Sequence, residues 1–127
     1  MRIQIVDAFT AQPFAGNPAG VVVLPEADFP GAEWMQRVAS EVNLSETAFL
    51  HPLPPGAEAD FALRWFTPVL EVALCGHATL ASRSFWAPSD ASTLRVCSRA
   101  TGIVTFWQSS PSTEPDGLIT RCIRWLP

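Results

Sequence analysis

The chain has 127 residues, of which 48% are hydrophobic, and its formal net charge is −4. A chain of this length buries one modest core, so we expect one domain or part of one rather than two complete domains. An acidic balance without a basic cluster gives no electrostatic support for a nucleic-acid or anionic-membrane partner. The absence of lysine excludes Schiff-base chemistry and a phosphate-loop lysine on this chain.

The cysteines and histidines limit the kinds of site that the chain can hold. Cys75, Cys97 and Cys122 are odd in number and form no CxxC pair, so neither a disulfide framework nor a structural zinc site is indicated. With two histidines we expect no metal site. The N-terminus lacks the apolar core of a signal peptide, and no stretch reaches the roughly 20 apolar residues of a membrane span. We expect a soluble, cytoplasmic protein with reduced thiols.

Two strands separated by a loop are predicted at the start of the chain. β-branched residues favour a strand near residues 3–9, and the apolar run at 20–24 is typical of a buried strand. The segment 12–20 between them is dense in turn formers. It is either a plain connector or a loop in which Asn17 faces a ligand.

A helix and a third strand follow, with Glu46 between them. Apolar residues three and four apart predict an amphipathic surface helix over 33–42, and a short strand is expected over 47–50. Glu46 lies between the hydroxyls of Ser45 and Thr47. It is either a solvated, turn-capping residue or, if it is enclosed by apolar side chains, a general acid or base.

The second half of the chain predicts further strands and one buried helix. The helix from His77 to about Trp86 is apolar or small on most sides, so we expect sheet to enclose it. From residue 108 onward the patterning dissolves. Strands are expected at 61–66, 71–74, 93–98 and 102–107, the last two forming a hairpin.

The stretch from Leu74 to Ala81 places a thiol, an imidazole and a hydroxyl within five residues. Gly76 allows the backbone to turn sharply where a strand becomes a helix. A helix start directs N–H groups outward, so a carboxylate or enolate oxygen could bind there. The alternative is that Cys75 and His77 are ordinary packed side chains.

Four stretches taken together resemble the phenazine-biosynthesis PhzF-like isomerase/epimerase family. The resemblance implies an α+β fold like one lobe of diaminopimelate epimerase, in which a mixed sheet wraps a central helix. The helix from His77 would be that central helix. The stretches are Val6 to Thr10 with Phe14 to Gly20, Asn43 to Phe49, Arg64 to Pro68, and Glu71 to Ala81.

The resemblance also implies roles for individual residues. Glu46 falls on the family's catalytic glutamate, which exchanges a proton with a substrate carbon. His77, together with Gly76, would contact the substrate carboxylate or assist proton movement, and Cys75 matches the thiol that related epimerases and proline racemases use as a base. The implied reaction is a cofactor-independent isomerisation or epimerisation beside the carboxylate of a small metabolite.

Three further residues are implied to bind substrate. Gly76 would lie against the substrate carboxylate, and Ser45 and Asn17 are second-rank binding candidates. Proton transfer of this kind needs groups on opposite sides of one carbon, which suits a cleft between two lobes.

The chain departs from the family in length. We expect residues 1–107 to form the N-terminal lobe and 108–127 to be a divergent or truncated tail, with no counterpart of the second lobe. Without that lobe we expect Glu46 and His77 to be wet and the isolated chain to be weak or inactive. The alternative is a non-catalytic binding protein whose exposed face pairs with another chain, as in a homodimer. A cysteine-based redox or hydrolytic enzyme has only the proximity of Cys75 and His77 in its favour.

Overall fold

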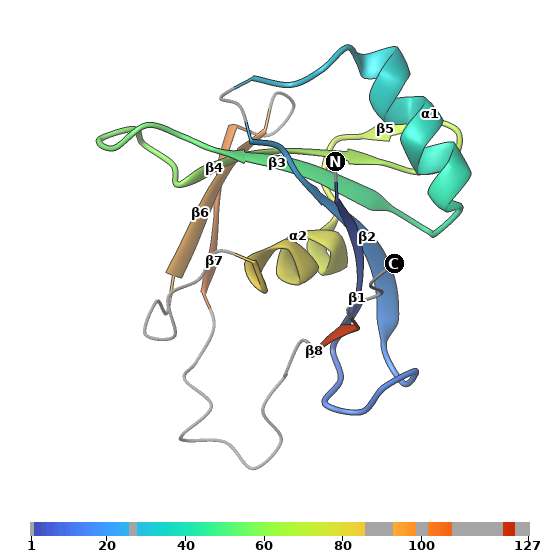
Figure 1. The fold of residues 1–127 in the computed structure, drawn as a ribbon. Helices are drawn as coiled ribbons and strands as arrows, with labels where there is room; N and C mark the ends of the chain where they lie inside the picture. The colour runs from blue at the N-terminus through green and yellow to red at the C-terminus, as the bar shows by residue number, and fades with distance from the viewer. Residues whose placement is uncertain (1, 26–27, 86–92, 99–101, 108–120, 124–127) are drawn as a thin grey trace.

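A computed structural model describes residues 2–25, 28–85, 93–98, 102–107 and 121–123. A curved sheet of eight strands surrounds one helix and carries the other on its outer side (Figure 1). The elements are β1 (Ile3–Ala8), β2 (Asn17–Val23), α1 (Ala32–Val42), β3 (Thr47–Pro52), β4 (Phe61–Phe66), β5 (Glu71–Val72), α2 (Gly76–Arg83), β6 (Thr93–Ser98), β7 (Gly102–Trp107) and β8 (Arg121–Ile123).

The sheet is mixed, with strand order β7-β6-β4-β3-β2-β1-β8 and β5 paired to β4 beside this path. Two of its pairings are parallel, β2 with β3 and β4 with β6. A parallel pair needs a crossover connection, and each of these crossovers contains a helix, α1 in the first and α2 in the second. Along the chain, each helix therefore connects two strands that are neighbours in the sheet. The junction that follows α1 and the junction that precedes α2 come close to one another.

Helix α1 covers the outer face of the sheet because its apolar residues recur at helical spacing. Met35 and Ala39 are buried and pack with Phe49 and Phe66 from the sheet. The helix ends at Asn43, whose φ of 53° is left-handed and whose backbone N–H donates to the carbonyl of Ala39 at 3.0 Å. Neither helix of the described part of the chain is long and apolar enough to cross a membrane.

Helix α2 lies inside the curve of the sheet and packs against β1, β2 and β3. Its enclosed positions carry small side chains, which allow strands to approach closely: Ala78, Thr79, Ala81 and Ser82 are all buried. Alternate residues of the strands supply the other half of this inner core, among them Val21, Leu63 and Trp65. The prediction of a helix enclosed by a mixed sheet is confirmed.

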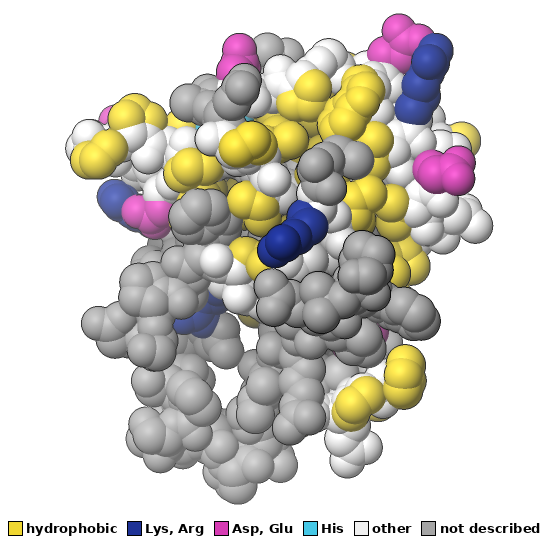
Figure 2. Space-filling model, viewed as in Figure 1, with side chains coloured by type: hydrophobic (Ala, Val, Ile, Leu, Met, Phe, Trp, Pro, Cys, Tyr) yellow, Lys and Arg dark blue, Asp and Glu magenta, His cyan; other side chains and the backbone are white. Residues whose placement is uncertain are grey.

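The surface seen in Figure 2 carries hydrophobic side chains over the sheet beside α1, with charged side chains around them. Arg37 forms an ion pair with Glu33 at 2.7 Å, and Arg95 forms another with Asp60 at 3.2 Å. Exposed pairs of this kind contribute little to stability. The stability of the fold therefore depends on the two clusters of buried apolar side chains, one beneath α1 and one around α2.

Several element bounds differ from the sequence prediction. β2 begins at Asn17 rather than near Gly20, because antiparallel pairing of Pro18 with Asp7 and of Asn17 with Ala8 draws turn-forming residues into the strand. β3 continues through Pro52, again through pairing with β4. Tertiary pairing thus overrode local propensity at these ends.

The other differences lie around α2 and in the predicted tail. β5 is only two residues long, since the chain leaves the sheet to enter α2, and α2 begins at Gly76 rather than His77. Within the segment predicted to be a tail, β8 pairs with β1. The expected helix end at Trp86 and the rest of the segment 108–127 lie outside the described residues. The hairpin of β6 and β7 is confirmed.

Gly20 allows β2 to pass close to the start of β3. A Cβ at this position would lie 2.8 Å from Thr47 Oγ1 and 3.2 Å from Val42 Cγ1. The backbone N–H of Gly20 also donates to the carbonyl of Glu46 at 3.0 Å. The close approach therefore fixes the backbone of Glu46 to the sheet.

Replacing Gly20 by alanine should lower the free energy of unfolding by about 1–3 kcal/mol, the usual cost of overpacking a core. Urea denaturation measures this change. Gly76→Ala is the matched control, because a Cβ there meets nothing within 4 Å and alanine favours helix, so its stability should be unchanged or higher. Equal losses in the two variants would show that close packing at Gly20 is not the cause.

Candidate active site

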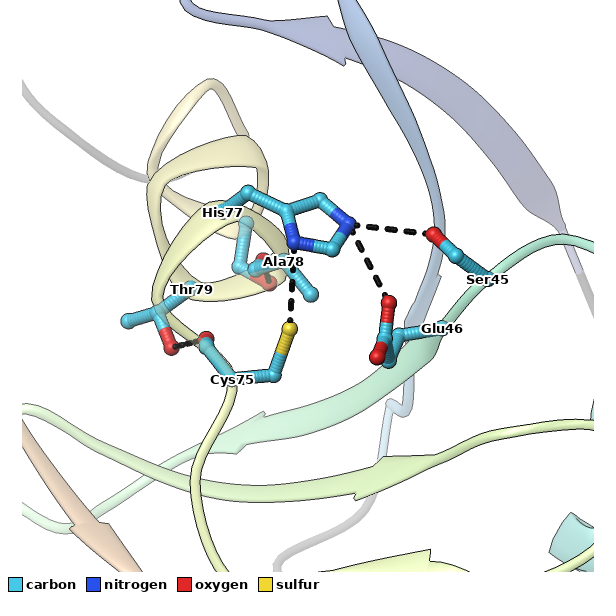
Figure 3. A network of polar contacts seen from close by, with 7 residues as sticks. Ser45, Glu46, Cys75, His77, Ala78 and Thr79 are labelled. Carbon is cyan, nitrogen blue, oxygen red and sulfur yellow. Dashed lines mark hydrogen bonds and ion pairs between the residues drawn. The ribbon is translucent and has the colours of Figure 1, made fainter.

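The imidazole of His77 lies between two groups that can exchange protons (Figure 3). Its Nε2 is 3.4 Å from Glu46 Oε2 and also 3.4 Å from Ser45 Oγ. Its Nδ1 is 3.3 Å from Cys75 Sγ. The ring thus separates a carboxylate and a hydroxyl on one side from a thiol on the other, and four of the residues singled out in the sequence meet at one place.

Glu46 and Ser45 reach this place from the junction between α1 and β3. Helix α1 ends at Asn43, and β3 begins at Thr47, whose side chain is fully buried. The glutamate side chain is 22% exposed and that of His77 is 11% exposed. The expectation that both side chains would be exposed to solvent is therefore wrong, because the sheet and α2 bury most of the surface of each.

Cys75 occupies the position immediately before α2. It is the N-cap residue, its backbone is extended with φ −140° and ψ 110°, and its side chain makes no capping hydrogen bond. Burial raises the pKa of its thiol, and the negative charge of Glu46 raises it further, while the backbone N–H groups of Ala78 and His77 lower it in part. The balance keeps the sulfur protonated, so Cys75 is a weak acid rather than a reactive thiolate.

Thr79 holds the turn that carries Cys75, a role that the sequence analysis did not assign. Its hydroxyl donates to the carbonyl of Cys75 at 2.6 Å, and its backbone N–H donates to the same oxygen at 3.1 Å. The residue is fully buried. A threonine four residues after the helix cap is the available signal, because Thr commonly donates to a carbonyl at that spacing.

Gly76 opens the site to the surface. It is exposed, and an added Cβ would meet nothing within 4 Å. The sharp turn expected of this glycine is not what the structure has, since Gly76 is the first residue of α2. Its missing side chain leaves room beside the helix start instead, where outward N–H groups favour an anion.

Arg64 and Glu71 fix the strand that leads into the site. The guanidinium donates from Nε to Glu71 Oε1 at 2.7 Å and from Nη2 to Oε2 at 2.6 Å, and Arg64 is 7% exposed. Two parallel hydrogen bonds of this kind define an orientation as well as a distance. They join β4 to β5 four residues before Cys75, and sequence reasoning missed them because only the fold shows that these strands pair.

Asn17 is not in the cluster around His77. It is the first residue of β2, exposed and opposite Ala8 of β1. The preceding loop is held by Asp7, whose Oδ2 accepts from the backbone N–H of Phe14 at 3.0 Å. A binding role for Asn17 stays a prediction.

Comparison with known proteins identifies the family of this chain. The model of the phenazine biosynthesis-like protein family, PhzC-PhzF, matches residues 6–121. The chain belongs to this family. The resemblance inferred from four short stretches of sequence is thereby confirmed.

Relatives within the phenazine biosynthesis-like family share much of the sequence of this chain. A protein of Halalkalibacterium halodurans named as an uncharacterized isomerase is 64% identical over 80 residues, which are 63% of this chain and 28% of the relative. The human phenazine biosynthesis-like domain-containing protein is 56% identical over 87 residues, covering 65% of this chain and 29% of that protein. The matched part of the chain spans less than a third of the length of these relatives.

A solved structure of the same family supports the fold. The crystal structure of a PhzF-family protein from Enterococcus faecalis superimposes with a TM-score of 0.70 at 40% identity, covering 84% of this chain and 40% of that one. The α+β architecture predicted from the sequence is confirmed by this likeness and by the mixed sheet around α2.

The buried thiol of Cys75 should make stability depend on pH. Because its pKa is raised in the folded chain, its contribution is fully present below the ordinary cysteine pKa of about 8.5 and is lost as the pH rises through the folded value. The free energy of unfolding should therefore fall more steeply above about pH 8.5 in the wild type than in Cys75→Ser. Urea denaturation across this range measures the difference.

The composition of the chain leaves few other groups that titrate in this pH range. With no lysine and no tyrosine, its other groups that titrate in the range are two further thiols and the amino terminus. A Cys97→Ser variant retains Cys75 and should keep the steep fall attributed to it. Parallel curves for the wild type and Cys75→Ser would contradict the inference.

Proposed function

We propose that this chain carries the proton-transfer half of a PhzF-like isomerase or epimerase site. The reaction is removal and return of a proton at a carbon beside the carboxylate of a small metabolite, without a cofactor. The observation that supports it best is the imidazole of His77 between the Glu46 carboxylate, 3.4 Å away, and the Cys75 thiol, 3.3 Å away. Relatives named as isomerases support the reaction class.

Glu46 is the base in this proposal. Its carboxylate takes a proton from the substrate carbon, and the electron pair left behind is delocalised into the substrate's own carboxylate or double bond. The protonated carboxyl then returns the proton to the same carbon or to another. Both steps balance without an external acceptor of electrons. The 22% exposure of the side chain leaves it accessible to a substrate.

The side chains of Cys75 and His77 form a chain of contacts that leads to Glu46. Since Cys75 keeps its thiol proton, its S–H donates to Nδ1 and the ring's own proton is on Nε2, directed at Glu46 Oε2. The same chain of groups can pass a proton from the thiol through the ring to Glu46. Ser45 accepts from Nε2 as well and helps to hold the ring.

The start of α2 is the proposed binding place for the substrate carboxylate. Gly76 is exposed with open space in front of it, and the N–H groups of a first helical turn favour an anion. Cys75, Gly76 and His77 are consecutive, so a carboxylate at Gly76 lies beside the proton-transfer groups. The reacting carbon next to that carboxylate then comes within reach of Glu46.

Activity of the isolated chain should be weak. Proton transfer at a carbon needs groups on opposite sides of it, and the part of the chain that matches its curated relatives spans less than a third of their length. The proton-transfer groups that the structure describes belong to a single cluster around His77.

Deuterium exchange tests the proposal without knowledge of the natural substrate. The chain is incubated in D₂O with small carboxylic acids that carry an acidic C–H beside the carboxylate, amino acids and enols among them, and loss of the C–H signal is followed by NMR. We expect slow exchange that Glu46→Gln reduces by about 10²- to 10⁴-fold, the usual contribution of general acid–base catalysis.

The matched control is Glu41→Gln, which removes an exposed carboxylate near the end of α1, in the same stretch of chain. This variant should exchange protons at the wild-type rate. Equal rates for Glu46→Gln and Glu41→Gln would contradict the role of Glu46, and rapid turnover by the isolated chain would contradict the expected weakness.

A further inference from the structure

The side chains around His77 are also a set of metal ligands. Glu46, Cys75 and His77 each offer one ligand atom, and these atoms all lie within 4.8 Å of one another. Thiolate sulfur, imidazole nitrogen and carboxylate oxygen are the ligand types that Zn²⁺ takes in proteins. We propose that Glu46, Cys75 and His77 form a binding site for a thiophilic divalent cation of the Zn²⁺ class.

The distances fit tetrahedral coordination with a small adjustment. Bonds of about 2.3 Å to sulfur and about 2.0–2.1 Å to nitrogen place those two atoms about 3.5 Å apart around a tetrahedral zinc ion. Cys75 Sγ and His77 Nδ1 are 3.3 Å apart. Glu46 must rotate its carboxyl inward from its position beside Nε2, and its partial exposure leaves it room to do so.

The site has three protein ligands and an open side. Gly76 leaves free space at the helix start, where a water molecule or a small carboxylate completes the coordination. Three protein ligands with one open position are typical of catalytic zinc sites, whereas structural sites are closed by four. The fourth position is therefore expected to take an exchangeable ligand.

Charge balance supports a divalent cation. As the S–Zn bond forms, the thiol of Cys75 gives its proton to solvent, so that thiolate and carboxylate together neutralise the two charges of the ion. No electron is transferred in this step. The lone pairs of Glu46, Cys75 and His77 are then engaged, so a bound cation blocks proton transfer. That inhibition rests on the proposed function, whereas the binding itself does not.

No sequence motif indicates this site, because metal motifs are recognised by short ligand spacings. Cys75 and His77 are two residues apart, but Glu46 comes from a different crossover of the sheet. Only the close approach of the α1–β3 junction to the start of α2 joins them.

The experiment uses the full chain with Cys97→Ser and Cys122→Ser, so that Cys75 is its only thiol. Titration with CoCl₂ should give a thiolate-to-cobalt charge-transfer band and the visible absorption of tetrahedral cobalt, and ZnCl₂ should bleach both at one equivalent. Octahedral cobalt absorption without the thiolate band would overturn the proposal, and this readout needs no change to the proposed ligands.

Variants in the same background assign the ligands. Cys75→Ser should abolish the charge-transfer band, and Glu46→Gln and His77→Gln should each weaken zinc binding in isothermal titration, with folding verified by circular dichroism. Glu41→Gln should bind zinc as the background does. Zinc affinity unaltered by Cys75→Ser would overturn the proposal. Because these measurements follow binding directly, they are independent of any failure to detect deuterium exchange.

Discussion

The structure depends on the burial of a short helix made of small side chains. Ala78, Ala81 and Ser82 let strands approach α2, while Trp65 and other large residues of the sheet fill the remaining space. Larger side chains on the helix would hold the sheet away, as interiors are packed at the density of organic crystals. The curvature of the sheet and the position of α2 therefore both follow from the same requirement for close packing.

The same packing brings the chemical groups together. Glu46 ends the first crossover of the sheet, and Cys75 and His77 begin the helix of the second. Parallel pairing of β2 with β3 and docking of α2 against them place the two junctions at one point. Gly20, which anchors the Glu46 carbonyl, belongs to this arrangement as much as the side chains do. Side chains from distant parts of the chain, Glu46 on one side and Cys75 and His77 on the other, are thus brought together by the packing of the sheet against α2.

Much of this could be predicted from the sequence. Periodicity located α1 and β4, and the small, apolar character of residues 77–86 indicated an enclosed helix. Motifs indicated Glu46, Cys75 and His77, which the structure brings together. Other features depend on pairing across the sheet, which no local pattern encodes. These include the early start of β2, the shortness of β5, and the ion pair of Arg64 with Glu71.

The residues that begin α2 are poor choices for a helix start. Ser, Thr, Asp or Asn before the helix contributes about 1 kcal/mol through a side-chain cap, and glycine costs helix stability where alanine would not. Cys75 and Gly76 occupy these positions, and Cys75 makes no side-chain cap. An eight-residue helix with such a start does not persist alone in water. The thiol and the imidazole therefore acquire their mutual orientation only once the surrounding strands have closed, so a nascent or partly unfolded chain carries both groups without the geometry that places them together.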